Sequence, residues 1–316
     1  MRAVVIDRFG GPEVLTVRDV DVPEPAADEL LVRVLASGTN PVDAKIRAAG
    51  QWAHIALPAI LGYDASGVVE RLGACVRDFD VGDEVFYTPE IVGNRYGTYA
   101  EYSVVPAAIV ARKPAALSHI EAAAVPLAGG TAWEAIVRRL AVRPGESVLI
   151  HGGAGGVGSF AVQFAKISGA FVIATAGPSN QAHLRELGVD VPLDYRSDDV
   201  VASSLEMTGG AGVDAVFDTV GGDVLQRSQQ AARPFGRLAT ILAPSGDFTH
   251  AYLHNQTIHG IFLTRERRRL EEMTPLLDHR RIRVVIERTL PLDQAAEAHR
   301  RLDSGHGWGK VVLEVV

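Results

Sequence analysis

The chain has 316 residues, of which 47% are hydrophobic and 22% charged, so wholesale disorder is excluded and about two domains are expected. Its 31 Lys and Arg against 38 Asp and Glu give a net charge of −7, which argues against general binding to nucleic acid or to an anionic membrane. The single cysteine, Cys75, excludes an internal disulfide framework and a cysteine-cluster zinc site, and it is typical of a reducing compartment.

Residues 1–117 alternate short β-type runs with Gly and Pro turn signals, which predicts a β-rich domain built as a partly open barrel. The first run has no signal-peptide core, and no stretch reaches the ~18 apolar residues of a membrane span, so we expect a cytoplasmic protein without a membrane partner. The expected strands are 1–6, 30–36, 67–72, 84–88 and 100–106.

The pattern changes near residue 118, where Ser118 and Glu121 have the spacing of a capping box. Pro126 is expected to interrupt this helix, with a second helix over 131–140. Strands and helices then alternate, which predicts a doubly wound, six-stranded parallel sheet of α/β class. The expected strands are 147–151, 170–175, 191–193, 215–218, 237–242 and 257–263, and the helices 157–168, 181–187, 200–207 and 224–232.

The carboxyl-terminal part begins with a charged helix from residue 264, whose alternating charges indicate a solvated face. Two β runs follow, over 284–287 and 311–316, which are too short to form a domain and should pair with the first one. We therefore expect a β-rich domain from residues 1–117 and 276–316, with a nucleotide-type domain over 118–275 between them.

The strongest local motif is Gly153-x-Gly155-x-x-Gly158, which follows a predicted strand and opens a predicted helix. In this context the glycines permit a tight turn, a close approach of backbone N–H groups to a pyrophosphate, and close packing of helix on strand. The helix amino terminus adds further N–H groups and a positive dipole end. The predicted dinucleotide contacts in the loop are Gly153, Ala154, Gly155, Gly156 and Val157.

The turn after the second predicted strand bears on which dinucleotide binds. Residues 176–180 contain no acid that would accept from a ribose 2′-hydroxyl, and this absence favours NADPH. Thr175, Gly177 and Asn180 are expected to face the phosphate. No Lys or Arg occurs before Arg185, so an ordinary turn without preference for either dinucleotide is the alternative.

As a whole, the chain resembles the zinc-independent quinone oxidoreductase (zeta-crystallin-like) branch of the medium-chain dehydrogenase/reductase superfamily. The resemblance implies a GroES-like substrate domain, an NADP-binding Rossmann domain, and usually a homodimer or tetramer. It rests on motifs spread over the full length: GTNPVDAKIR (38–47), LPAILGYDASGVVE (57–70), VGDEVF (81–86), VPLAGGTAWEAI (125–136), VLIHGGAGGVG (148–158), VIATAG (172–177), DTVGG (218–222), GRLATI (236–241) and GKVVLE (309–314).

Zinc-dependent relatives have a catalytic Cys–His–Cys set, which the resemblance matches to Asn40, Tyr63 and Leu127. None of these is a thiolate or imidazole, so no metal is expected. Without a Lewis acid, the expected reaction is hydride transfer from NADPH to a small electrophilic acceptor, either a quinone or the double bond of an α,β-unsaturated carbonyl. Thioester-linked acceptors are not separated from these. The alternatives are a non-catalytic NADPH-binding redox sensor or structural protein and a zinc alcohol dehydrogenase, which would need a bound metal.

The resemblance also indicates the catalytic candidates, each with a structural alternative. Asn40 and Thr131 match positions near the nicotinamide; the alternatives are a turn residue and a helix cap. Tyr63 is a candidate proton or hydrogen-bond donor to the acceptor oxygen, or a structural tyrosine. Trp52 could stack on a flat quinone or simply pack. Asp64 is expected to bind nearby backbone rather than act as a base.

The remaining cofactor positions implied by the resemblance are Tyr195, Val220, Gly221, Phe262, Leu263 and Lys310. Lys310 is expected to reach the phosphate or to be solvated. The apolar strand over 257–263 should lie at one edge of the parallel sheet. Such an edge needs cover, and pairing with a second copy would form a homodimer.

Overall fold

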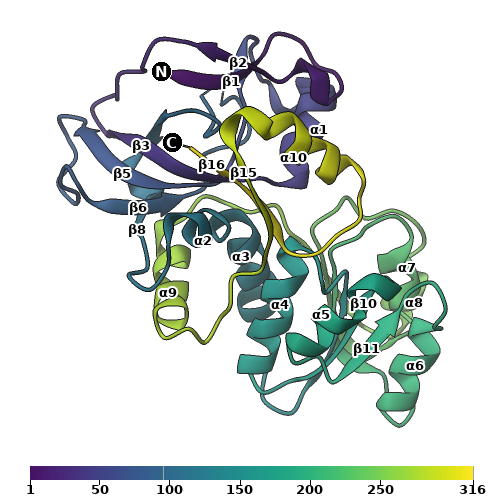
Figure 1. Cartoon of the computed structure of the whole chain (residues 1–316). Coiled ribbons are helices and arrows are strands. Elements are labelled where there is room, and N and C mark those ends of the chain that lie inside the picture. The colour runs from purple at the N-terminus through teal and green to yellow at the C-terminus, as the bar shows by residue number, and fades with distance from the viewer. Residues whose placement is uncertain (95, 316) are drawn as a thin grey trace. The chain divides into compact units, whose positions relative to one another are not determined.

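The computed structural model describes residues 1–94 and 96–315, and its chain divides into two compact units (Figure 1). The barrel domain comprises Met1–Leu127, Thr264–His306 and Lys310–Val316. The Rossmann domain comprises Ala128–Leu263 and Gly307–Gly309. The chain therefore leaves the barrel domain, forms the Rossmann domain, and returns.

The barrel domain contains two sheets around one apolar core. The small sheet has the order β2-β1-β4, and the larger one has the order β15-β16-β3-β5-β6-β8 with β7 paired to β3. The core joins Ile6, Leu30, Leu61, Tyr87 and Leu313, all buried. The strands are β1 (Arg2–Ile6), β2 (Thr16–Asp19), β3 (Glu29–Gly38), β4 (Ala59–Ile60), β5 (Ala65–Leu72), β6 (Glu84–Tyr87), β7 (Tyr102–Pro106), β8 (Ala111–Arg112), β15 (Ile286–Pro291) and β16 (Lys310–Glu314).

The two carboxyl-terminal strands complete the larger sheet. β16 pairs antiparallel with β3, where Val312 faces Gly38, and β15 lies parallel to β16. This pairing confirms that the last β runs return to the first domain. Val316, the final residue of the expected strand 311–316, lies outside the described residues.

Helix α1 (Pro41–Ala49) was not predicted, because Asn40-Pro41 has the sequence of a turn. Pro41 instead occupies the first helical position, where a missing N–H has no cost and the fixed φ suits the helix. The Asp43 carboxylate accepts the backbone N–H of Asn40 at 2.8 Å. The helix start thus places Asn40 directly beside the end of β3.

Helices α2 (His119–Ala123), α9 (Arg267–Asp278) and α10 (Ala295–Asp303) also belong to the barrel domain. The expected boundaries, 117/118 and 275/276, had assigned α2 and most of α9 to the nucleotide-type domain. α2 packs on β3 and β5, and Arg267 of α9 pairs with Asp78 at 3.0 Å. Local sequence cannot show which sheet covers the apolar side of such a helix, so the boundaries differ.

In the Rossmann domain, all strands are parallel, in the order β11-β10-β9-β12-β13-β14. All six lie within the described residues, which confirms the doubly wound sheet. β14 lies at one edge, as expected, but it ends at Gly260. The strands are β9 (Ser147–His151), β10 (Phe171–Ala176), β11 (Val191–Asp194), β12 (Val213–Asp218), β13 (Ala232–Thr240) and β14 (Thr257–Gly260).

Helices cover both faces of this sheet. Figure 1 shows α4 and α5 on one side of β10 and β11, and α6, α7 and α8 on the other. Reversal of the strand order at β9 and β12 puts the two sets of crossover helices on opposite faces. The helices are α4 (Gly156–Ile167), α5 (Gln181–Glu186), α6 (Val200–Met207), α7 (Val224–Ser228) and α8 (Thr249–Leu253).

One helix start was predicted wrongly. α3 runs over Pro126–Trp133 and continues as a π-helical segment over Glu134–Arg139. Pro126 does separate the two helices, because α2 ends at Ala123, but Pro126 is itself the first residue of α3, a position that suits proline. Thr131 lies inside the helix, so its alternative interpretation as a helix cap is wrong.

Candidate functional site

The loop between β9 and α4 has the geometry of a dinucleotide cradle. Gly152 has φ +71°, in the left-handed region, and turns the chain out of the strand. A Cβ on Gly158 would lie 2.1 Å from the Gly152 carbonyl oxygen, so only glycine lets α4 pack this closely on the turn. Gly155 precedes the first residue of α4, whose unpaired N–H groups open onto this turn. The residues present therefore suit a pyrophosphate.

The other candidate residues of the Rossmann domain lie at the same end of the sheet as this loop. Gly177 follows β10, Tyr195 follows β11, Val220 and Gly221 follow β12, and Phe262 follows β14. In a parallel sheet all of these positions lie at the carboxyl ends of the strands, where open α/β sheets bind their ligands. The side chains of Tyr195, Val220 and Phe262 are largely exposed, whereas Leu263 is buried.

The side chains of two candidate residues bind backbone groups at this end of the sheet and so stabilise its loops. Thr175 is buried, and its hydroxyl oxygen accepts the Gly152 N–H at 3.2 Å. Asn180 donates its side-chain N–H to the Gly307 carbonyl oxygen at 3.0 Å. The structure thus gives both side chains a role in positioning the cradle and the turn after β10.

The segment Gly307–Gly309 belongs to this end of the sheet as well, which sequence reasoning missed. Gly309 donates its N–H to the Ala154 carbonyl oxygen at 2.8 Å, and the Trp308 ring stacks on His183 with 4.1 Å between centroids. A glycine-rich run before a terminal strand has no motif that would predict this docking. Its effect is to brace the glycine loop and the start of α5.

The turn after β12 is held by a buried carboxylate. Asp218 accepts the backbone N–H groups of Val220 and Gly221 at 2.8 and 2.9 Å. His151 lies nearby, buried and 2.8 Å from the Ser228 hydroxyl, and burial lowers its pKa to about 4. A neutral, hydrogen-bonded His151 is structural.

In the barrel domain, Asn40, Asp64 and Lys310 form one buried cluster. The Asn40 amide donates to the Asp64 carboxylate at 2.9 Å, and the Lys310 ammonium donates to the Asn40 side-chain oxygen, to the Thr39 carbonyl and, at 3.3 Å, to Asp64. The second Asp64 oxygen accepts the Leu127 N–H at 2.7 Å. Burial raises the pKa of Asp64, and the ammonium opposes that shift.

This cluster corrects one expectation and supports another. Lys310 is only 4% exposed, so its interpretation as a solvated lysine is wrong. Asp64 does bind nearby backbone, as expected. No sequence motif linked Lys310 to Asp64, because 246 residues separate them along the chain.

The same cluster bears on whether a metal fits. The positions matched to metal ligands are Asn40, Tyr63 and Leu127. They present an amide that is already bound to Lys310 and Asp64, a phenol and an alkyl chain. The nearby Asp64 carboxylate is occupied by an ammonium and two N–H donors. Among the described residues, no group of three or more His, Cys, Asp or Glu side chains is placed to hold a metal ion. This donor set does not suit zinc, which takes thiolate, imidazole or free carboxylate ligands.

Tyr63 follows the cluster in chain order and is fully buried. Within the described part of the chain its hydroxyl has no hydrogen-bond partner. Burial raises the pKa of Tyr63, the neighbouring Asp43 charge adds to the increase, and Arg265 opposes it. The phenol therefore remains protonated at neutral pH and keeps a donor proton available.

A second polar network adjoins Asn40 and was not predicted. Asp43 accepts the Tyr99 hydroxyl at 2.7 Å, and the same hydroxyl lies 3.2 Å from His299. Arg47 contacts the other ring nitrogen of His299 at 3.2 Å, and burial lowers the pKa of His299 to about 3. Burial also raises the pKa of Asp43 to about 7. The network fixes α1, and with it Asn40, against the barrel.

Trp52 and Thr131 remain candidates with different surroundings. Trp52 lies in a short 3₁₀ turn over Gly50–Ala53 and is 47% exposed, so its ring is available for stacking. Thr131 is nearly buried within α3. The exposure of Trp52 agrees with both of its interpretations, whereas Thr131, inside the helix, keeps only the predicted position near the nicotinamide, which stays a prediction.

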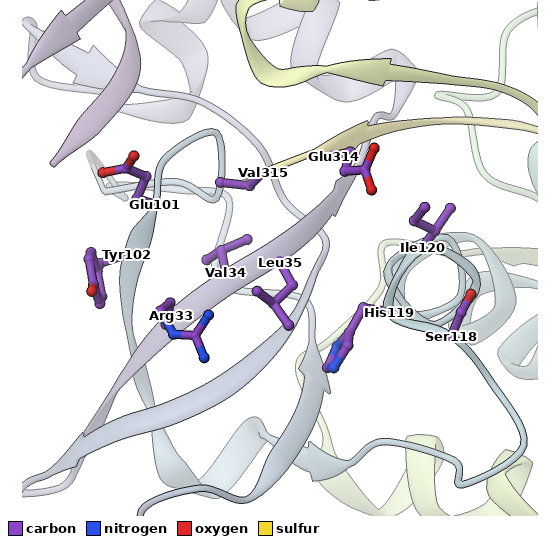
Figure 2. Close-up of a pocket in the computed structure, with 10 residues that line it drawn as sticks. All are labelled: Arg33, Val34, Leu35, Glu101, Tyr102, Ser118, His119, Ile120, Glu314 and Val315. Carbon is purple, nitrogen blue, oxygen red and sulfur yellow. The ribbon is translucent and has the colours of Figure 1, made fainter.

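A cavity of about 610 Å³ in the barrel domain contains none of the candidate residues. It lies between β3, α2 and the end of β16, and Figure 2 shows Arg33, His119 and Ile120 among its lining side chains. His119 is bound to Ser66 at 2.8 Å and Glu84 at 3.2 Å, and Arg33 lies 3.7 Å from Glu70. These side chains already have partners, so the cavity offers few free polar groups to a ligand.

None of the described helices is long and apolar enough to cross a bilayer.

Comparison with known proteins assigns the family. Residues 26–115 match the alcohol dehydrogenase GroES-like domain, and residues 187–313 match the zinc-binding dehydrogenase domain. The chain is 33% identical to a quinone oxidoreductase of Pseudomonas aeruginosa, covering 96% of this chain and 97% of the relative. It is 32% identical to a chloroplastic NADPH-dependent alkenal/one oxidoreductase of Arabidopsis thaliana, covering 99% and 79%.

Solved structures agree with these relatives. The crystal structure of Escherichia coli quinone oxidoreductase complexed with NADPH superposes with a TM-score of 0.90 at 30% identity, covering 99% of this chain and all of the other. An NAD-dependent alcohol dehydrogenase superposes with a TM-score of 0.93 at 36% identity over the whole of both chains. The chain is therefore an oxidoreductase that belongs to the quinone oxidoreductase branch of the medium-chain dehydrogenase/reductase superfamily, as its motifs indicated.

Proposed function

We propose that this protein reduces a quinone, or the double bond of an α,β-unsaturated carbonyl, with NADPH and without a catalytic metal. The observation that carries the proposal is the Asn40–Asp64–Lys310 cluster, where an internal ammonium engages the donor atoms that a metal would need. Without a Lewis acid, the acceptor must itself be electron-poor, and conjugated carbonyls meet that condition. The relatives' names, quinone oxidoreductase and alkenal/one oxidoreductase, support the same two acceptor classes.

The Rossmann domain would hold the cofactor. The N–H groups of Gly156 and Val157 would bind the pyrophosphate, whereas the Gly155 N–H already donates to the Gly152 carbonyl oxygen at 3.0 Å. The turn at Val220 and Gly221 would lie along the ribose. The turn after β10 has no carboxylate, which supports NADPH over NADH. When bound, NADPH supplies the hydride.

The barrel domain would bind and polarise the acceptor. Tyr63, whose hydroxyl has no hydrogen-bond partner among the residues that the structure describes, would donate to the acceptor carbonyl oxygen, where negative charge develops during reduction. Lys310 and Asp64 fix the orientation of the Asn40 amide. Asn40 would then help to hold the nicotinamide and the acceptor in place for hydride transfer. Trp52 would stack on a flat acceptor. Reduction adds one hydride and one proton, and Tyr63 or water would supply the proton.

The test is NADPH oxidation by purified protein with a simple quinone and, separately, an α,β-unsaturated ketone, with NADH as the paired control. Turnover that survives exhaustive chelation, in protein with less than stoichiometric zinc, is the expected result. Stoichiometric zinc whose removal abolishes turnover would refute the metal-free reaction. NADPH binding without turnover on either acceptor would favour the non-catalytic alternative.

We further propose that the protein forms a homodimer through β14. This strand lies at the sheet edge, and exposed apolar side chains precede it in α8 and in β13, where the Phe235 N–H donates to the His254 carbonyl oxygen. Phe235 is 67%, Leu253 66% and Tyr252 81% exposed. Pairing two β14 edges would satisfy their free backbone groups and cover these side chains. Light scattering at micromolar concentration should give twice the chain mass, and a monomeric mass would refute the dimer.

A further inference from the structure

The turn after β10 lacks a feature that an NADPH site needs. A 2′-phosphate is normally met by a cation, and residues 176–180 contain neither Lys nor Arg. The fold supplies a cation from the next strand instead. β11 pairs in parallel with β10, with Asp194 opposite Ala176, so the residues that follow the two strands lie side by side.

Tyr195 is the first residue after β11, and it lies against this turn. Its backbone N–H points to the Ala176 carbonyl oxygen at 3.4 Å. A Cβ built on Gly177 would lie 3.7 Å from the Tyr195 ring and 3.8 Å from its hydroxyl. The ring therefore borders the position where a ribose 2′-substituent enters a Rossmann site, and it is half exposed.

Arg196 is held on this ring. Its guanidinium carbon lies 5.6 Å from the ring centroid, within range of a cation–π interaction. A hydrogen bond with the Tyr195 side chain raises the pKa of Arg196. Among the described residues, no carboxylate lies within salt-bridge distance of it, whereas other arginines of this chain, such as Arg233, Arg237 and Arg301, are so paired. The fork of the guanidinium is thus pre-positioned without an anion.

The carboxylates nearby are engaged by the backbone. Asp194 accepts the Arg196 N–H at 3.0 Å, and Asp198 accepts the Asp194 N–H at 2.7 Å. These bonds shape the turn that presents Arg196. An arginine suits the task because its planar fork can bind two phosphate oxygens at once.

We propose that Arg196, held on the Tyr195 ring, binds the 2′-phosphate of NADPH and sets the preference for NADPH over NADH. This inference rests on the proposed use of NADPH. NADH has a hydroxyl at that position and would leave the guanidinium without an anion. Arg196 therefore compensates for the cation missing after β10.

The experiment measures dissociation constants by fluorescence and calorimetry, so it does not depend on turnover. In Arg196→Ala, NADPH and the fragment 2′,5′-ADP should each bind about 10- to 100-fold more weakly, since one charge-assisted pair is lost. NADH and 5′-AMP should change less than about twofold. Arg196→Lys should recover part of the affinity, because a single ammonium replaces the fork.

Arg143→Ala is the matched control. Arg143 is also exposed, but it precedes β9 and so lies at the amino ends of the strands, opposite the proposed cofactor site. Arg143→Ala removes the same charge as Arg196→Ala. It should leave the affinities for NADPH, 2′,5′-ADP, NADH and 5′-AMP unchanged. Far-UV circular dichroism and thermal melts of each variant exclude unfolding as the cause of any loss.

Two outcomes would overturn the inference, and they are distinguishable. If the wild type prefers NADPH and Arg196→Ala keeps that preference, Arg196 is not the ligand, while the proposed function stands. If the wild type binds NADPH no more tightly than NADH, the proposed cofactor preference fails, and the role of Arg196 fails with it.

Discussion

Replacing Lys310 by methionine tests the buried cluster most directly. Lys310 and Asp64 are 4% and 0% exposed, and their charged atoms lie 3.3 Å apart. At an effective dielectric constant of ~20 that separation corresponds to about 5 kcal/mol of Coulomb attraction. The Leu127 N–H and the Asn40 amide still bind the carboxylate and offset part of the loss. We therefore expect Lys310→Met to lower the free energy of unfolding by about 3 kcal/mol, near the lower end for breaking a buried pair.

The assay is urea unfolding followed by circular dichroism, with Lys45→Met as the control. Lys45 is exposed on α1, and its loss should change the free energy of unfolding by less than about 0.5 kcal/mol. The double variant Asp64→Asn/Lys310→Met should be less destabilised than the sum of the single variants by more than about 1.5 kcal/mol. Additive effects, or a Lys310→Met cost below about 1 kcal/mol, would refute the role assigned to the pair.

The pH dependence of this variant gives a second check. Without the ammonium, the folded-state pKa of Asp64 should rise further above its unfolded value, so the protonated form is favoured in the folded protein. The cost of Lys310→Met should then shrink as pH falls towards the unfolded pKa of ~4 and be largest above the raised folded pKa. A cost that is constant between pH 5 and pH 8 would indicate lost packing rather than an uncompensated charge.

Three further predictions follow from single side chains. Tyr63→Phe should leave the free energy of unfolding unchanged or raise it by up to about 1 kcal/mol, because the buried hydroxyl has no partner among the described residues, while kcat falls about 10- to 100-fold; unchanged kcat would exclude Tyr63 as the donor. Gly158→Ala, whose Cβ would lie 2.1 Å from the Gly152 carbonyl oxygen, should cost more than about 2 kcal/mol and weaken NADPH binding; a normal melting temperature would contradict the close packing. His151 has a folded pKa of about 4, below its unfolded value of 6.5, so stability should fall by up to about 3 kcal/mol as pH drops through this interval, and His151→Gln should flatten that slope; an unchanged slope would contradict the assignment.

Local sequence was sufficient where a short-range pattern has one physical solution. The glycine motif between a strand and a helix predicted the β9–α4 cradle, because few other residues permit that turn and that packing distance. Alternating apolar strands and helices predicted the parallel sheet, and the edge position of β14 followed from chain order. Helix starts at proline were the recurrent error: Pro41 and Pro126 each begin a helix, whereas a turn was expected at Pro41 and the helix after Pro126 was expected to begin only at residue 131.

What the sequence determined by itself was therefore the family, the two-part architecture and the glycine turn between β9 and α4. These features depend on neighbours within about 30 residues of chain or on motifs spread over the whole chain. The tertiary structure alone decided which distant side chains meet. It brought Lys310 to Asn40 and Asp64, and it placed the Tyr195 ring, which carries Arg196, beside the turn after β10. The physical reason is that pairing between strands far apart in sequence brings these buried charges and strand ends together. The spacing of residues along the chain does not show which strands will pair.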